Sequence, residues 1–155
     1  MDTPIKRKRQ HTASAAALAT GAELSRRGYD VAFTLGNTAR LDMLCNAPNG
    51  KAFKVQVKGI SDKYGFYIDK SFFDGEEEDL FLVVVLVPFG EEEPFQFFVL
   101  SHAEAKKEFS KMPLIHRDGT PLKASGPGLN WGSVKGYAGW TSLYRCLSAK
   151  SSGGG

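Results

Sequence analysis

The sequence predicts one α/β domain with a mixed central β-sheet flanked by helices. Segments of helical composition stand near both ends of the chain, and segments rich in β-branched and aromatic residues stand between them. The apolar run 80–87 has the composition of a strand buried on both faces, as in the middle of a sheet. A length of 155 residues suits one domain and is sufficient for a hydrophobic core without disulfides.

The first half of the chain predicts a helix followed by strands. Residues 12–27 are expected to be helical, because Ala, Leu and Glu are frequent there and Gly28 stands where a C-terminal cap belongs. The strands expected after it are 29–35, 40–47, 52–59 and a shorter one at 64–69. The sequence Pro-Asn-Gly at 48–50 is a strong turn signal, so the second and third of these strands form a hairpin.

The second half predicts two strands and a helix before the pattern weakens. The strands are 80–87 and 94–100. A helix then starts at Ser101 and continues to about residue 111, and Glu104 completes a capping box at its start.

Glycine and proline are frequent beyond Met112, so that part is expected to be rich in loops. Trp131 and Trp140 either anchor these loops to the body of the protein or, with Tyr137, stack on nucleic-acid bases. A short last helix is expected over residues 141–147.

Charge is unevenly distributed along the chain. The net charge of +3 is too small to establish a polyanionic partner, but acidic residues gather at 76–79 and 91–93 and basic residues near the N-terminus. The basic run consists of Lys6, Arg7, Lys8 and Arg9. A run of this kind contacts phosphate or serves as a solubilising tail, and the sequence leaves both interpretations open.

The cysteines and the apolar segments indicate a cytoplasmic protein without membrane association. Cys45 and Cys146 have neither CxxC nor metal-site spacing, which favours a reducing compartment. The Ala-rich stretch after the basic run is too weakly apolar for a secretion signal, and no apolar run is long enough to span a bilayer. We expect residues 1–11 to form a basic arm, 12–150 a single domain and 151–155 a flexible tail.

The hairpin at residues 40–59 places several polar side chains on one face. With the turn centred on Asn49, Asp42 lies directly opposite Gln56, and the alternation of side chains puts Lys58 on the same face. Arg40 and Lys54 belong to this face as well. The opposite face is expected to be core, and it carries Leu41, Met43, Cys45, Phe53, Val55 and Val57.

This grouping suits metal-assisted hydrolysis of a phosphodiester bond. Asp42 is a ligand for a hard divalent cation, and Gln56 and the Val57 backbone carbonyl offer neutral oxygen ligands. Lys58 orients a water and stabilises charge that builds on phosphate. The alternative is an ordinary exposed hairpin face with an Asp–Lys cross-strand pair, and spacing alone favours that alternative.

The stretch 22–59 resembles the core of PD-(D/E)XK nuclease-like proteins, which have a restriction-endonuclease-like fold. The helix leads into the segment RRGYDV, Asp42 matches the acidic strand residue, and Gln56-Val57-Lys58 matches the QxK variant of the second motif. The strands at 80–87 and 95–100 and the helix opening at Ser101 also agree with this family. The resemblance implies a nuclease fold and a magnesium or manganese site at Asp42.

Two departures from the family pattern weaken the expected metal site. Many relatives have a Glu in the first helix, where this sequence aligns Ala17, and Glu23 lies about 120° away around the helix. Gln56 replaces the usual acid, so the site has a single carboxylate. Mg²⁺ or Mn²⁺ is therefore expected to bind weakly without substrate, and either DNA phosphates complete its coordination or catalysis has been lost.

The sequence is compatible with two functions. The first is a metal-dependent DNA endonuclease in which Asp42, Gln56 and Lys58 act in catalysis and basic residues contact DNA. It is expected to work as a homodimer or beside partner proteins, because two strands require two cuts. The DNA-contacting residues would be Lys6, Arg7, Lys8, Arg9, Arg40 and Lys54. The second is a catalytically decayed module that binds DNA or protein. Neither requires a small-molecule cofactor.

Overall fold

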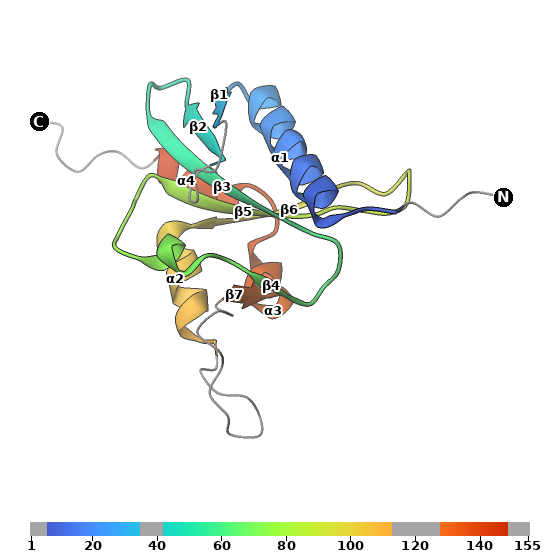
Figure 1. Ribbon diagram of the computed structural model, residues 1–155. Coiled ribbons are helices and arrows are strands. Elements are labelled where there is room, and N and C mark those ends of the chain that lie inside the picture. Colours follow the sequence, from blue (N-terminus) through green and yellow to red (C-terminus); the bar gives the residue numbers. More distant parts are fainter. Residues whose placement is uncertain (1–5, 35–41, 113–127, 149–155) are drawn as a thin grey trace, which may run out of the picture.

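A computed structural model describes residues 6–34, 42–112 and 128–148 of the protein. Its centre is a five-stranded sheet in the order β1-β2-β3-β5-β6, shown in Figure 1. The strands are β1 (Asp30–Phe33), β2 (Met43–Asn46), β3 (Ala52–Ile60), β5 (Leu80–Leu86) and β6 (Gln96–Ser101). β3 and β5 are parallel while the other neighbours are antiparallel, so the predicted mixed sheet is confirmed.

β5 occupies the interior of the sheet, as its composition predicts. β3 and β6 pair with its two edges, and residues 80–85 are buried with Leu86 partly buried because a hydrophobic core covers each face of the sheet. The chain between β3 and β5 contains β4 (Gly65–Tyr67) and the 3₁₀ turn η1 (Lys70–Phe73). Such a crossover is what a parallel pair of strands requires.

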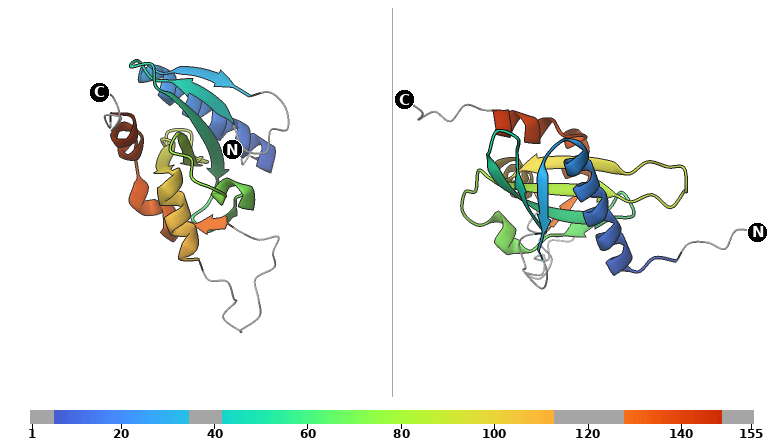
Figure 2. Two further views of the ribbon diagram at one scale, coloured as in Figure 1. Left: turned by 90° about the vertical axis from the view of Figure 1, so that its left-hand side faces the viewer. Right: turned by 90° about the horizontal axis from the view of Figure 1, so that it is seen from above.

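Helices cover both faces of the sheet, as Figure 2 shows. α1 (Arg9–Arg26) and α4 (Thr141–Ser148) pack on one face, over a core that includes Met43, Phe53 and Val83. α2 (His102–Ser110) lies on the other face, over a second core that includes Leu82 and Phe98. None of the helices in the described ranges has the length and apolarity needed to cross a membrane.

α1 begins at Arg9, three residues before the predicted start at Thr12. The helix extends this far because the ring nitrogen Nδ1 of His11 accepts a hydrogen bond from the Lys8 backbone N–H at 3.1 Å, which caps the first turn. Residues 9–11 thus belong to the helix and not to an extended arm. At the other end, Gly28 has φ of +89°, which agrees with the predicted glycine cap.

The predicted capping box at the start of α2 is confirmed. The hydroxyl of Ser101 accepts a hydrogen bond from the Glu104 N–H at 3.1 Å, and a carboxylate oxygen of Glu104 accepts one from the Ser101 N–H at 2.9 Å. Two of the N–H groups at the start of the helix are satisfied in this way.

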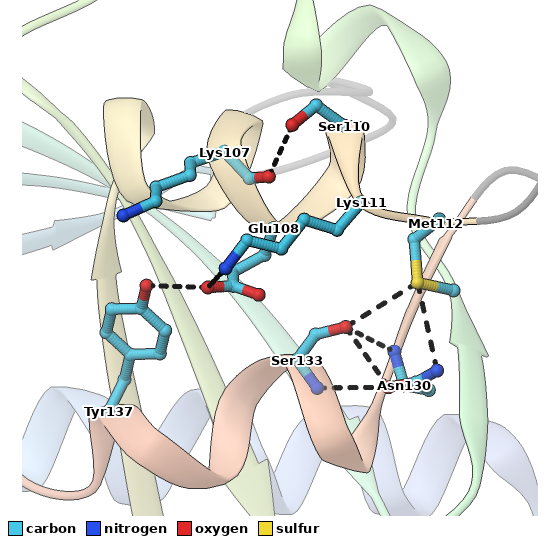
Figure 3. Close-up of polar contacts among 8 residues, drawn as sticks. All are labelled: Lys107, Glu108, Ser110, Lys111, Met112, Asn130, Ser133 and Tyr137. Carbon is cyan, nitrogen blue, oxygen red and sulfur yellow. Dashed lines mark hydrogen bonds and ion pairs between the residues drawn. The ribbon is translucent and has the colours of Figure 1, made fainter.

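The C-terminal part contains elements that the sequence pattern does not predict. β7 (Gly128–Asn130) pairs with β4 in a small second sheet, and α3 (Trp131–Val134) and the 3₁₀ turn η2 (Lys135–Tyr137) follow. Figure 3 shows that the Tyr137 hydroxyl attaches this part to α2 by donating a hydrogen bond to Glu108 at 2.9 Å. It also shows the cap of α3, in which the Asn130 side chain accepts the Ser133 N–H at 3.0 Å. The three residues of β7 carry too little local pattern to predict a strand, because pairing with the distant β4 decides it.

Both tryptophans anchor the C-terminal part to the sheet. The ring of Trp131 stands edge-on to Phe98 with centroids 4.9 Å apart, and the ring of Trp140 packs beside Phe97 at 5.4 Å. Trp140 is 7% exposed, so its ring belongs to the core. The structure thus supports the anchoring interpretation for both residues.

Candidate active site

A cleft of about 770 Å³ opens where β3 continues past its last pair with β2. The first turns of α1 form one wall and residues 56–62 form the floor. Residues 65–69, which include β4, form the other wall. Asp42, Gln56, Val57 and Lys58 all line this cleft. The three side chains that the sequence singles out for catalysis therefore converge on one cavity.

The hairpin register explains this convergence. Met43 pairs with Val55 and Cys45 with Phe53, and continuing the same register places Asp42 opposite Gln56, as predicted. Met43, Cys45, Phe53 and Val55 are buried on the α1 side of the sheet. Alternation along the strand turns Gln56 away from that core.

Asp42 is held in place by the backbone of β3. Its N–H donates to the Val55 carbonyl at 3.0 Å, and its carboxylate oxygen Oδ2 accepts the Val57 N–H at 2.7 Å. Because the N–H and C=O of a strand residue point to the same edge, the Val57 carbonyl faces the Asp42 side as well. Burial raises the pKa of the Asp42 carboxyl, and the Val57 hydrogen bond opposes this effect in part.

Gln56 contributes an oxygen that lacks a partner. Its side-chain Oε1 is buried and receives no hydrogen bond from the residues that the structure describes. An unsatisfied buried acceptor costs about 1–3 kcal/mol, so a protein retains one where something else supplies the missing interaction. A carboxamide oxygen is a suitable ligand for a hard cation.

Lys58 is half-buried and has no hydrogen bond or ion pair with another described residue. Burial lowers the pKa of its amine, and the positive charge of Arg9 lowers it further. Its amine is not within 4.0 Å of the Asp42 carboxylate, so the simple cross-strand ion pair is not formed. The interpretation of this face as an ordinary Asp–Lys pair therefore does not apply.

The donor set of the cleft fits a divalent cation that keeps other ligands. Among the described residues no three His, Cys, Asp or Glu side chains form a metal-binding group. The hairpin offers the Asp42 carboxylate and the Gln56 Oε1, which has no partner among the described residues, and the Val57 carbonyl stays a predicted ligand. The cleft lining also includes Asp62 and Asp69, and the Asp69 side chain accepts the Ser71 N–H at 2.8 Å. A carboxylate with neutral oxygens beside it suits Mg²⁺, which holds several waters and binds substrate phosphates.

α1 approaches β3 closely beside Lys58. A Cβ on Gly59 would lie 2.7 Å from the Thr12 carbonyl oxygen and 2.9 Å from the Ala16 Cβ, so only glycine permits this approach. The hydroxyls of Thr12 and Ser61 are hydrogen-bonded at 3.2 Å across the same contact. The helix wall of the cleft is therefore fixed on the strand that supplies Gln56 and Lys58.

The helix brings a cation and no carboxylate to the cleft. Its lining residues are Arg9, Gln10, Thr12 and Ala13. Ala17, where the sequence alignment puts the acid of relatives, packs against the core one turn further on. Glu23 is occupied by ion pairs to Arg26, at 3.0 Å, and to Arg27, so it does not substitute.

The residues predicted to contact DNA divide into different environments. Lys6, Lys8 and Arg9 are exposed, whereas Arg7 donates to the carbonyls of Val87 and Pro88 at 2.9 and 2.7 Å. The position of Arg40 lies outside the described residues.

Lys54 is engaged within the protein. Its amine lies 3.0 Å from the Glu77 carboxylate and 3.6 Å from that of Asp79. A contact of Lys54 with DNA stays a prediction.

Sequence reasoning did not separate Arg9 from the rest of the basic run. It predicted the short strand at 64–69, where β4 lies, but not that this strand forms a wall of the cleft. Arg9 stands in the cleft only because α1 starts at that residue. The β4 wall, which includes Tyr67, depends on pairing with β7 more than 60 residues later in the chain. No local pattern in the sequence signals the start of α1 at Arg9 or the pairing of β4 with β7.

The fold is a nuclease-like α/β fold, with a five-stranded mixed sheet flanked by helices. Among solved structures, a bacterial homing endonuclease, I-Ssp6803I, resembles it with a TM-score of 0.51 and 18% sequence identity. The similarity covers 89% of this chain and 93% of that one. No protein-family model matches the sequence, and no curated relative matches it.

Proposed function

We propose that the protein is a metal-dependent DNA endonuclease of the PD-(D/E)XK type, with its active site at Asp42, Gln56 and Lys58. The observation that carries the proposal is one cleft that holds a carboxylate, a buried carboxamide oxygen and an amine, the last two without a partner among the described residues. The fold similarity to a homing endonuclease supports DNA as the substrate.

Asp42, Gln56 and the Val57 carbonyl would hold Mg²⁺ or Mn²⁺. When bound, the cation polarises the phosphate and lowers the pKa of a water. The protein's own part is to place the ligands: the Val57 N–H holds one Asp42 oxygen at 2.7 Å and leaves the other for a ligand. Hydrolysis joins a water oxygen to phosphorus as one phosphorus–oxygen ester bond breaks.

Lys58 would stabilise the negative charge that develops on the phosphate. Its amine is not tied up in an ion pair with a described residue, so no existing interaction has to break before it contacts the substrate. A charged group placed beforehand in a partly buried cleft stabilises a transition state more than the same group in water.

Because the hairpin supplies only one carboxylate, we expect metal and DNA to bind together. Mg²⁺ gives up water reluctantly and prefers charged oxygens, so two neutral oxygens beside Asp42 give it a weak site. DNA phosphates would complete the coordination. We expect the affinity for Mn²⁺ to rise when DNA is present.

The alternative is a decayed nuclease that binds DNA without cutting it. It is favoured by one observation, the absence of an acidic side chain on the α1 wall of the cleft. In that case Gln56 and Lys58 would serve binding alone.

Cleavage of a randomised pool of DNA duplexes, with Mg²⁺, Mn²⁺ or EDTA, tests the proposal. The pool avoids dependence on one recognition sequence, and sequencing the new ends detects rare cuts. We expect metal-dependent cuts that disappear in Asp42→Asn and Lys58→Met and persist in Lys107→Gln, a distant exposed lysine on α2. DNA retardation without any cut, unchanged in the first two variants, would establish the alternative.

We also propose that two copies act together on duplex DNA, since a cut in both strands requires two active sites. Sedimentation of the protein on a cleavable duplex in EDTA measures the number of copies bound. One copy per duplex, with both strands still cut in the presence of metal, would contradict this.

A further inference from the structure

The basic run at the N-terminus contains two arginines with different surroundings. The guanidinium of Arg7 donates to the carbonyls of Val87 and Pro88 and stands 3.8 Å from the centre of the Phe89 ring. These contacts attach the start of α1 to the loop between β5 and β6. Arg7 is therefore an anchor within the protein, and its charge is already engaged.

Arg9 stands two residues later and faces the cleft. It is the first residue of α1, it is exposed, and no hydrogen bond or ion pair joins it to another described residue. It lines the same cavity as Gln56 and Lys58.

The position of Arg9 is fixed from two sides. The Arg7 anchor holds the residues before it, and the Thr12–Ser61 hydrogen bond with the close approach at Gly59 holds the turn after it. The backbone of Arg9 therefore has little freedom relative to β3. A side chain placed in this way loses less entropy on binding a ligand than one on a free arm.

The cleft holds the cations Arg9 and Lys58 together with the carboxylates of Asp42, Asp62 and Asp69. Neither cation forms a hydrogen bond or an ion pair with another described residue, so both can bind an anion that enters the cleft. Of the anions that fit a cleft of this size, phosphate matches the planar guanidinium, which donates two parallel hydrogen bonds to its oxygens. We propose that Arg9 binds a DNA phosphate in the cleft and holds it against Lys58, while Lys6 and Lys8 make only long-range contributions. This rests on the proposed function and assigns the α1 wall to substrate binding in place of a metal-binding acid.

The test compares Arg9→Gln with Lys107→Gln, which removes the same charge from an exposed position on α2. Both variants are expected to have the same denaturation midpoint as the wild type. At saturating DNA with Mn²⁺, we expect Arg9→Gln to cut about 10²-fold more slowly than the wild type, as for the loss of one placed donor. The cleavage rate of Arg9→Lys should lie between those of the wild type and Arg9→Gln, because lysine keeps the charge but cannot donate two parallel hydrogen bonds.

A second measurement does not depend on cleavage. In EDTA, the affinity for a short mixed-sequence duplex is measured against salt concentration. We expect Arg9→Gln to lower the slope of log affinity against log salt by about one, and Lys107→Gln to leave it unchanged.

The outcomes separate the two proposals. If Arg9→Gln behaves as Lys107→Gln in both measurements, or changes affinity but not the rate at saturation, the cleft role of Arg9 is wrong. If the wild type cuts no DNA, the endonuclease proposal fails, and the salt slope in EDTA still decides whether Arg9 binds phosphate.

Discussion

Two lysines on the same face of β3, four residues apart, occupy opposite environments. Lys54 stands near the start of the strand, where its amine lies beside the carboxylates of Glu77 and Asp79, and the hydrogen bond that it donates to Glu77 raises its pKa. Lys58 stands near the end, where burial and Arg9 lower its pKa and no carboxylate of the described residues pairs with it. One strand thus carries a satisfied cation and an unsatisfied one.

The difference separates interactions that stabilise the fold from groups that a substrate must complete. An ion pair such as Lys54–Glu77 joins β3 to the loop before β5 and needs nothing from outside. Lys58, with the unpartnered oxygen of Gln56 and the partly buried Asp42, costs folding energy instead. Groups in such conflict with stability are frequent at functional sites.

The largest effect should come from Lys58→Met, which keeps the length of the side chain and removes the charge. We expect cleavage to fall about 10²- to 10³-fold, as for the loss of one transition-state donor. Stability at neutral pH should be unchanged or higher, because the lowered pKa shows that the fold disfavours the charged amine. Cleavage rates and urea denaturation measure the two effects, and a variant that loses both activity and stability would make Lys58 a structural residue.

The next largest effect should come from Gly59→Ala, which disturbs the end of β3 beside the cleft without changing Lys58. The new Cβ would meet the Thr12 carbonyl, so α1 has to move, and we expect a loss of about 1–3 kcal/mol. The control is Gly65→Ala on the other wall, where the nearest atom is 3.8 Å away. Equal denaturation midpoints for the two variants would contradict the close approach of α1.

Lys54→Met should have a smaller effect, a loss of about 0.5–1 kcal/mol of stability from its partly exposed ion pairs. The raised pKa of Lys54 means that its contribution is complete below the ordinary lysine pKa of 10.5 and disappears as pH rises through the folded value. Urea denaturation at increasing pH should show the gap to the wild type closing above that value.

The same variant sharpens the comparison with Lys58. Cleavage by folded Lys54→Met is expected to fall far less than cleavage by Lys58→Met. Equal losses would mean that Lys54 leaves its ion pairs to contact DNA.

The smallest effect concerns the pH dependence of Asp42→Asn. Asparagine keeps an oxygen for the Val57 N–H but cannot ionise. Because burial raises the Asp42 pKa above 3.8, the wild type should lose stability relative to the variant as pH rises through the folded pKa. The denaturation midpoints of the wild type and Asp42→Asn should coincide in acid and diverge towards neutral pH. A difference between the two midpoints that is the same at every pH would contradict this prediction.

Local pattern was sufficient for the central hairpin, the buried strand and the second helix. Side-chain alternation and the turn at residues 48–50 place Asp42 opposite Gln56, and both features belong to a short stretch of chain. The capping box at Ser101 likewise lies within four consecutive residues, 101–104. These features are predictable because neighbours in sequence decide them.

The first helix shows where local pattern stops. Ala13 and Ala17 lie one turn apart on the same side of α1, so the helical period identifies the face that meets β3 but not which turn stands over Lys58. Packing at Gly59 decides that, and it puts Arg9 and Ala13 in the cleft wall while Ala17 faces the core.

The different roles of like residues came only from the tertiary structure. Arg7 and Arg9 look alike in the sequence, as do Lys54 and Lys58, and their partners come from distant segments at residues 77–79 and 87–89. Whether a charge is satisfied depends on what the folded chain brings beside it, and no local period contains that information.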